Sequence, residues 1–156
     1  MTSWADGAHL PDVNVRIAMV SDRHEHHVSA RRWFESASAR AAFCRVTQMG
    51  FLRLLTNRKV MGDDTLTPAQ AIAMYRKFAT DERVYFVPEP GGLEEAWISL
   101  MNSPATSSSR WTDAYLAAFA MKSGLRLVTF DKGMSTWPAL DFRLLRALRS
   151  RRSCGR

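Results

Sequence analysis

Short apolar runs alternate with longer segments of helical periodicity along most of the chain. The apolar runs predict strands at residues 9–12, 42–46, 84–87, 125–130 and 140–145. The longer segments predict helices at residues 13–20, around 30–37, and at 48–57, 67–80, 92–100 and 111–123. The run at 125–130 is the clearest strand. The run at 9–12 is a poor one, because Pro11 suits only the start or the edge of a strand.

Apolar spacing also indicates which side of each helix faces inward. The expected inward residues are Ala30, Trp33, Phe34 and Ala37 in the second helix, Ile72, Tyr75 and Ala79 in the fourth, and Ala114, Tyr115, Ala118 and Phe119 in the last. The fourth helix has the cleanest start, because Thr67 is a suitable N-cap and Pro68 and Gln70 follow it. Trp33, Trp97 and Trp111 lie on apolar helical faces and are interpreted as core residues rather than as surfaces for stacking bases.

Alternation of strands and helices predicts a parallel sheet with helices on both faces. The expected fold is therefore an α/β protein, a three-layer α/β/α sandwich with a short, mostly parallel central sheet. A chain of 156 residues has room for one such domain, expected over residues 1–145, followed by a tail at 146–156. Ligands of these sheets bind beyond the carboxyl ends of the strands, so the residues after each apolar run are candidates for a site.

Composition is that of a soluble globular protein, with 46% apolar and 24% charged residues. No apolar run reaches the roughly 18 residues of a membrane span. The first ten residues lack the features of a signal peptide, so we expect a cytoplasmic protein without membrane contact. Cys44 is expected to be a small core residue and Cys154 an exposed free thiol, and neither belongs to a metal-binding pair.

The net charge of +7 is concentrated at the end of the chain. The last 14 residues contain no acid and six arginines, namely Arg143, Arg146, Arg149, Arg151, Arg152 and Arg156. The rest of the chain therefore carries about +1. Such a tail suits the phosphates of a nucleic acid, but it also suits a solvated segment that keeps the protein soluble, and the charge alone does not decide between the two.

Three aspartates occupy positions where this fold would gather them. Asp12 follows the first strand, Asp131 follows the strand at 125–130, and Asp113 lies in the first turn of the last helix. Each also has an ordinary structural explanation: for Asp12 a helix cap, for Asp131 a turn, and for Asp113 a favourable interaction with a helix dipole. Neighbouring carboxylates repel one another, and a hard dication removes that repulsion. Oxygen ligands alone favour Mg²⁺ or Mn²⁺ over zinc, and such a site could support phosphodiester hydrolysis.

A second group of potential ligands is the histidine cluster of His24, His26 and His27. Their spacing does not place them on one helical face, and no fourth ligand is near in sequence, so a loop or helix-start role is favoured over a zinc site. A receiver-like phosphorylation domain is also disfavoured. It needs paired acids after the first strand and a lysine late in the sheet, and neither is found here.

Four sequence blocks together resemble the signature blocks of VapC-type PIN-domain toxins. They are Asp12-Val13-Asn14-Val15, Thr47-Gln48-Met49-Gly50-Phe51-Leu52-Arg53, Trp111-Thr112-Asp113-Ala114-Tyr115-Leu116-Ala117-Ala118 and Thr129-Phe130-Asp131-Lys132-Gly133. Each block is weak alone, but all four stand in the family's order and spacing and cover nearly the whole chain. The resemblance implies a toxin of a type II toxin–antitoxin system: an Mg²⁺- or Mn²⁺-dependent endoribonuclease that often forms homodimers and is inhibited by a cognate antitoxin.

The resemblance also implies roles for individual residues. Asp12, Asp113 and Asp131 match the family's catalytic and metal-binding acids, and Asn14 matches a polar residue that supports the first acid. Gln48 stands where PIN domains commonly have a glutamate, and a glutamine brings an amide oxygen but no charge. This departure leaves an alternative function open, that of a catalytically weakened PIN domain that binds RNA or an antitoxin without efficient turnover.

Overall fold

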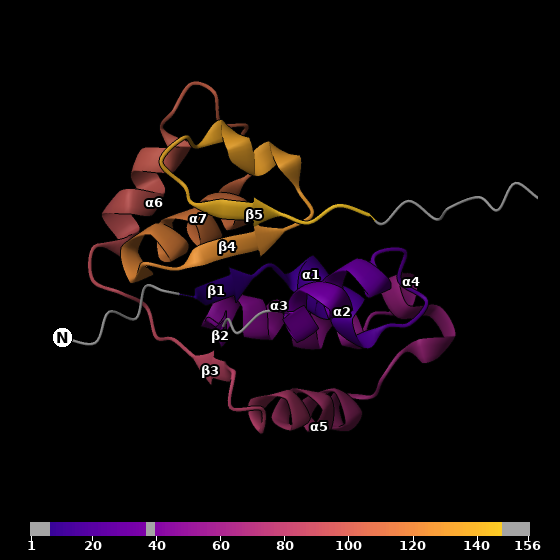
Figure 1. Ribbon diagram of the computed structural model, residues 1–156. Coiled ribbons are helices and arrows are strands. Elements are labelled where there is room, and N and C mark those ends of the chain that lie inside the picture. Colours follow the sequence, from indigo (N-terminus) through magenta and orange to yellow (C-terminus); the bar gives the residue numbers. More distant parts are fainter. Residues whose placement is uncertain (1–6, 37–39, 148–156) are drawn as a thin grey trace, which may run out of the picture.

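The computed structural model describes residues 7–36 and 40–147, which form a single parallel sheet between two layers of helices (Figure 1). The strands are β1 (Ala8–Pro11), β2 (Arg40–Phe43), β3 (Val84–Phe86), β4 (Arg126–Thr129) and β5 (Phe142–Leu144). The helices are α1 (Val13–Val20), α2 (His27–Ser36), α3 (Arg45–Leu55), α4 (Arg58–Met61), α5 (Pro68–Ala79), α6 (Leu93–Met101) and α7 (Trp111–Ser123), with short 3₁₀ turns η1 (Gly62–Asp64) and η2 (Lys132–Thr136).

The strand order is β3-β2-β1-β4-β5, and every pair of neighbours is parallel. The predicted three-layer α/β/α fold with a short parallel sheet is therefore confirmed. β1 lies at the centre although it ends in a proline. Pro11 is the last residue of the strand. The hydrogen bond to β4 at this end comes from the next residue, because the N–H of Asp12 donates to the Val128 carbonyl at 2.8 Å. The carboxyl ends of β1, β4 and β5 point to the same side of the molecule (Figure 1).

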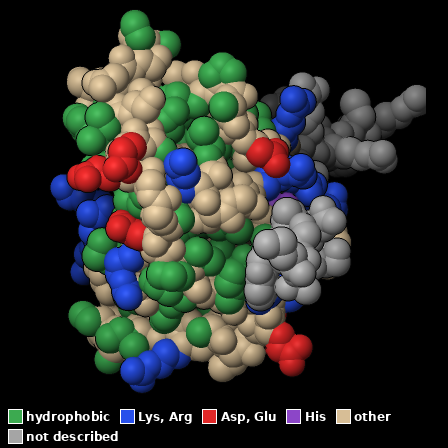
Figure 2. Space-filling view, turned by 90° about the vertical axis from the view of Figure 1, so that its left-hand side faces the viewer, with side chains coloured by type: hydrophobic (Ala, Val, Ile, Leu, Met, Phe, Trp, Pro, Cys, Tyr) green, Lys and Arg blue, Asp and Glu red, His purple; other side chains and the backbone are tan. Residues whose placement is uncertain are grey.

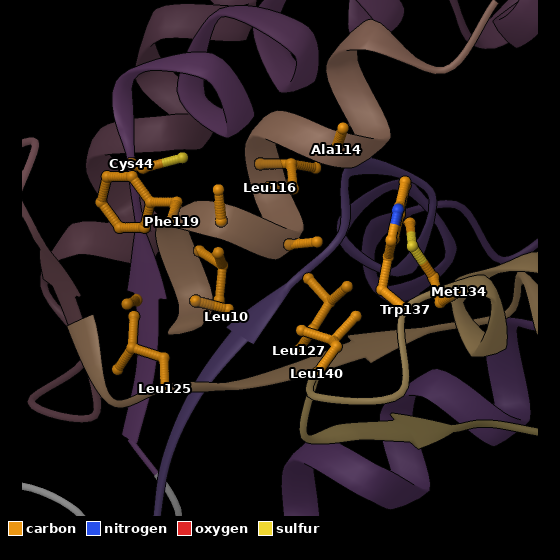
Figure 3. Packing of buried hydrophobic residues seen from close by; sticks show 14 of the residues in the cluster. Leu10, Cys44, Ala114, Leu116, Phe119, Leu125, Leu127, Met134, Trp137 and Leu140 are labelled. Carbon is orange, nitrogen blue, oxygen red and sulfur yellow. The ribbon is translucent and has the colours of Figure 1, made fainter. Parts of the chain in front are cut away.

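Successive strand residues point to opposite faces of the sheet and belong to two separate hydrophobic cores. On one face, Leu10 and Leu127 pack with α7, α6 and the η2 segment, where Met134 and Trp137 close the core (Figure 3). On the other face, Phe43 and Val128 pack with α1, α2, α3 and α5. The sheet is thus buried on both sides, as expected for a parallel sheet. Cys44 belongs to the first core, which confirms its predicted role.

Several predicted details were wrong. The strand expected at 42–46 is β2, which ends at Phe43, and α3 begins at Arg45 rather than at residue 48. In α5, Ile72 is 42% exposed and Ala79 is also exposed. Tyr75 packs inward as predicted, and the other inward residues of α5 are Ala71, Met74 and Phe78. Both stripes have helical spacing, so periodicity alone left the rotation of this helix open.

The tryptophans divide between interior and surface. Trp33 is buried and Trp97 is partly buried, in agreement with the prediction of core residues. Trp111 is 53% exposed, and the core prediction for it was wrong. It stands in the first turn of α7 and packs edge-on against Trp97, whose indole N–H donates to the Trp111 carbonyl at 2.9 Å. Trp111 therefore covers Trp97 from the solvent side.

Arg16 is a fully buried arginine in α1, a helix whose only other polar residue is Asn14. Its Nη2 donates to the carbonyl of Ala42 at 2.5 Å, and the guanidinium lies 3.8 Å from the centre of the Phe43 ring. Burial lowers the pKa of Arg16 to about 9. Its Nε and Nη1 have no hydrogen-bond partner among the described residues.

Parts of the prediction fall outside the described residues. Ala37, Cys154 and residues 148–156 of the basic tail are among them. Within residues 7–36 and 40–147, no helix combines the length and the hydropathy that crossing a bilayer requires.

Candidate active site

The three predicted aspartates come from three elements that meet at the carboxyl edge of the sheet. Asp12 directly follows β1, and its backbone N–H donates to the carbonyl of Val128 in the neighbouring β4 at 2.8 Å. Asp131 follows β4 after one intervening residue, and Asp113 lies in the first turn of α7. The opposite side of the molecule, at the amino ends of the strands, shows only scattered acidic side chains (Figure 2).

Asp12 is the most enclosed of the three carboxylates. Its Oδ1 accepts from the backbone N–H of Val13 at 2.7 Å and thereby caps α1, as the sequence predicted. Its Oδ2 accepts from the Thr129 hydroxyl at 3.2 Å. Burial raises the pKa of Asp12, and repulsion from Asp113 and Asp131 raises it further. Repulsion from the other two aspartates is thus a smaller cause of the raised pKa of Asp12 than its burial.

Asp113 and Asp131 are bridged by an arginine that the sequence analysis did not identify. Arg110 Nε donates to Asp113 Oδ2 at 3.2 Å, and Arg110 Nη2 lies 3.6 Å from Asp131 Oδ2. The arginine side chain is only 15% exposed. One of its nitrogens therefore stands beside each carboxylate, and the single cation offsets part of their combined negative charge.

Arg110 also fixes the segment that carries Asp131. Its Nη1 donates to the Gly133 carbonyl at 2.7 Å and to the Thr136 hydroxyl at 3.1 Å, and its guanidinium lies 4.5 Å from the centre of the Trp137 ring. A Cβ at Gly133 would stand 2.9 Å from Asp131 Oδ1 and 3.3 Å from Arg110 Nη1. The N–H of Gly133 donates to Asp131 Oδ1 at 2.8 Å, which holds this oxygen close to the Gly133 backbone. A side chain at position 133 would collide with it.

The donor set fits a hard dication in its chemistry. All three groups are carboxylates. Burial is the main cause of the raised pKa of Asp12, and bound Mg²⁺ or Mn²⁺ would relieve the smaller contribution that comes from repulsion by the other two. Within the described ranges, however, no three acidic, histidine or cysteine side chains stand together as ready metal ligands. Arg110 provides a physical reason, because it engages the oxygens of Asp113 and Asp131.

The two residues predicted to support the site, Asn14 and Gln48, have different surroundings. Asn14 lies in the first turn of α1 and is exposed. Gln48 is in the first half of α3, and its side-chain oxygen accepts from the guanidinium of Arg45. α3 approaches α1 closely at Gly50, where an added Cβ would stand 2.8 Å from Val13. This packing brings the middle of α3 beside Val13, the residue that follows Asp12. The side-chain oxygen of Gln48 is engaged by Arg45 rather than by the site.

The histidines occupy the loop and helix-start positions that the sequence predicted. His24 and His26 lie between α1 and α2, and both rings stack on Phe130. His27 begins α2, and its Nδ1 is 2.7 Å from the carbonyl of Ala18.

Two residues with a clear part in this geometry were missed by sequence reasoning. Thr129 holds Asp12, and its hydroxyl also accepts from the backbone N–H of Asp131 at 3.0 Å, so it links two of the carboxylates. Arg110 stands three residues before Asp113, a spacing at which helical side chains meet. That spacing was the available signal for Arg110. Nothing local in the sequence revealed its contacts with residues 131–137.

The carboxylate repulsion leads to a prediction about stability. Because the folded state raises the pKa of Asp12 above its ordinary 3.8, the folded protein binds this proton more tightly than the unfolded chain does. The stability contributed by the protonated form is thus present at low pH and is lost as the pH rises through the raised pKa. Asp12→Asn keeps a capping oxygen and removes the charge. In EDTA at neutral pH, we expect it to raise Tm, by about 2–4 °C for each ~1 kcal/mol of relief.

Differential scanning calorimetry of both proteins, in EDTA and in Mg²⁺, measures this effect. The dication should raise Tm of the wild type more than that of Asp12→Asn, because the variant has less repulsion to relieve. A lower Tm for Asp12→Asn in EDTA at neutral pH would show that the ionised carboxylate stabilises the fold.

Comparison with known proteins gives consistent similarities. Residues 10–139 match the model of the PIN domain family. Ribonuclease VapC41 of Mycobacterium tuberculosis is 39% identical over 142 residues, which cover 87% of this chain and 97% of the relative. Ribonuclease VapC39 of the same organism is 38% identical over 128 residues, which cover 81% of this chain and 90% of the relative.

Solved structures resemble the fold at much lower sequence identity. VapBC2 from Rickettsia felis, crystallised with a DNA fragment from its promoter, superposes with a TM-score of 0.66 at 10% identity and covers 89% of this chain and 99% of that chain. VapC20 of Mycobacterium tuberculosis, described as a toxin that cleaves the sarcin–ricin loop, superposes with a TM-score of 0.62 at 19% identity, with 81% and 92% covered. At these identities the two structures support the fold alone.

Proposed function

This chain belongs to the PIN-domain family, within its VapC ribonucleases, and we propose that it is an Mg²⁺- or Mn²⁺-dependent endoribonuclease that acts as the toxin of a toxin–antitoxin pair. The observation that carries the proposal is the placement of Asp12, Asp113 and Asp131 at the carboxyl edge of the sheet. Thr129 hydrogen-bonds to Asp12 and to the backbone of Asp131, and Arg110 lies against both Asp113 and Asp131. The ribonuclease names of its relatives support RNA as the substrate.

The roles proposed for the residues follow from their surroundings. Asp12, Asp113 and Asp131 would hold the dication, which when bound supplies a polarised water and positive charge against the phosphate. Thr129 fixes the orientation of the Asp12 carboxylate through its hydroxyl. Arg110 fixes the position of Asp113 relative to the segment that carries Asp131. The protein's contribution is thus to preorganise charge at one edge of a rigid sheet.

The partners proposed for the chain are RNA, a cognate antitoxin and a second copy of the same chain. The fold is shared with a toxin–antitoxin complex from Klebsiella pneumoniae and with VapBC2 from Rickettsia felis, and this likeness is the ground for proposing an antitoxin partner. Induced expression of this chain alone should arrest growth and produce discrete RNA fragments. Co-expression with the product of a neighbouring small gene for a DNA-binding protein should reverse the arrest. Normal growth with intact RNA at high expression would contradict the toxin proposal.

Gln48 offers a test that separates an efficient enzyme from a weakened binding module. Gln48→Glu adds one negative charge at the start of α3. If position 48 faces the dication, the Mg²⁺ concentration for half-maximal cleavage should fall about fivefold, the effect of ~1 kcal/mol expected for one charge several ångströms away in a wet site. Steady-state cleavage over a range of Mg²⁺ concentrations measures this directly.

The control for this substitution is Gln70→Glu, which adds the same charge at the exposed start of α5. An unchanged Mg²⁺ requirement in Gln48→Glu would mean that position 48 lies beyond the reach of the metal. Cleavage by Gln48→Glu together with an inactive wild type would favour the binding module.

The basic tail gives a quantitative prediction about RNA binding. A chain ending at Ala147 lacks four arginines, Arg149, Arg151, Arg152 and Arg156. If all four contact phosphates, the slope of log Kd against log salt should become shallower by about three units, since each contact to a single strand contributes roughly 0.7. Fluorescence anisotropy with labelled RNA at several salt concentrations measures the slope. An unchanged slope would identify the tail as a solvated segment.

A further inference from the structure

An aromatic stack stands directly beside the proposed active site. Phe130 lies between Thr129 and Asp131, and the ring of His26 stacks on it with centroids 4.4 Å apart and planes 24° apart. His24 stacks on the same ring at 6.5 Å. Burial lowers the pKa of His24, so this residue is a neutral ring at pH 7. The stack therefore connects the loop before α2 to the end of β4.

The loop that supplies the histidines is held in place from both sides. The backbone N–H of His26 donates to His24 Nδ1 at 3.1 Å, and His27 Nδ1 is 2.7 Å from the Ala18 carbonyl of α1. The His26 side chain is nevertheless 23% exposed, and its Nε2 lies 3.4 Å from the exposed carboxylate of Glu25. The stack thus reaches the surface as a fixed feature rather than closing inside the core.

A hollow of about 350 Å³ opens against this stack. Its lining includes His26, Phe130, Lys132, Leu144, Leu145 and Arg146. The end of β5 is fixed there by two bonds. The Ser29 hydroxyl of α2 donates to the Arg146 carbonyl at 2.7 Å, and the N–H of Leu145 donates to the Thr129 carbonyl at 2.8 Å. The loop before α2, the segment after β4 and the end of β5 therefore line the hollow.

The walls combine the two chemistries that a nucleotide requires. His26 and Phe130 offer aromatic surface and Leu144 and Leu145 offer apolar surface, as a base needs. Lys132 and Arg146 are exposed cations, as a phosphate needs, and no acid lines the hollow among the residues that the structure describes. Lys132 is the residue after Asp131, so the hollow adjoins the segment that carries one of the three carboxylates.

We propose that this hollow is a nucleotide subsite, which binds a base of the RNA strand against His26 and Phe130 and its phosphate at Lys132 and Arg146, next to the bond that is cut. The subsite rests on the proposed ribonuclease function and adds to it a means of holding the substrate. It also gives a role to the histidine loop, which the carboxylate chemistry does not use.

The test compares the binding of two probes, a short labelled oligoribonucleotide and an abasic ribose-phosphate strand of the same length. Fluorescence anisotropy is measured in the Asp113→Asn background with EDTA, so that the RNA stays intact. His26→Ala should weaken binding of the oligoribonucleotide by about fivefold or more, because a stacking surface is lost. It should leave binding of the abasic strand within about twofold. His26→Phe keeps an aromatic ring and should restore tight binding.

The cationic half of the subsite has its own readout. Lys132→Ala and Arg146→Ala should each weaken binding of both probes and reduce the salt slope by roughly 0.7. Arg76→Ala is the control, because Arg76 is an exposed arginine of α5 outside the hollow, and it should leave both Kd and slope nearly unchanged.

The outcomes distinguish this inference from the proposed function. RNA cleavage by the wild type, with His26→Ala binding both probes as the parent does, would overturn the subsite and leave the ribonuclease intact. Equal weakening of both probes by His26→Ala, without recovery in His26→Phe, would mean that the loop has only a structural role. A wild type that neither binds nor cuts RNA would overturn both proposals.

Discussion

Asp113→Asn should reduce RNA cleavage at least about a hundredfold, a loss of ~3 kcal/mol in transition-state stabilisation, while the fold stays intact. The substitution keeps the shape of the side chain and removes a negative charge from the carboxylate cluster. The new amide could no longer pair with Arg110 as an ion, but α7 is held by its buried face and not by this contact. Initial cleavage rates, together with circular dichroism spectra, measure both parts of the prediction.

The other two carboxylates should follow in a graded way. Asp12→Asn should be as damaging as Asp113→Asn, because Asp12 is enclosed and affected by both other charges. Asp131→Asn should cost less, since Asp131 is exposed and its Oδ1 already serves the turn at Gly133. Asp141→Asn is the control, because this aspartate pairs with Arg126 on the surface. Wild-type rates in all three site variants would place the active site elsewhere.

Removal of divalent cations should stop cleavage as completely as the loss of a carboxylate does. Three like charges at one edge of the sheet favour the dication that neutralises them, and their oxygen donors favour Mg²⁺ or Mn²⁺. Cleavage in EDTA should therefore fall at least about a hundredfold and return when excess Mg²⁺ or Mn²⁺ is added. Cleavage that persists in EDTA, or that returns only with Zn²⁺, would contradict the carboxylate chemistry.

Much of the fold could be predicted because its signals are local. The apolar run before Asp131 and the capped start of α5 each depend on a few neighbouring residues, and both were found where expected. The rotation of α5 could not be predicted, because the stripes through Ala71 and through Ile72 have the same period. The surface position of Trp111 depends on how α6 and α7 meet, which no local pattern contains.

The same distinction applies to the candidate site. The three aspartates could be proposed from strand ends and from a helix start, since a parallel sheet brings such positions to one edge. Arg110 could not, because its significance lies in contacts with Gly133, Thr136 and Trp137, residues more than twenty positions away. The role of Gln48 stays a prediction, since the structure shows its amide oxygen on Arg45.

The central claim is that Asp12, Asp113 and Asp131 together hold the dication with which the chain cuts RNA. Electron paramagnetic resonance of Mn²⁺ titrated into the protein without RNA tests it most directly, because bound and free Mn²⁺ give different signals. We predict a saturable Mn²⁺ site in the wild type and in Asp141→Asn, with affinity at least about tenfold weaker in Asp12→Asn and Asp113→Asn. Equal Mn²⁺ affinity in the wild type and in both site variants would contradict the claim.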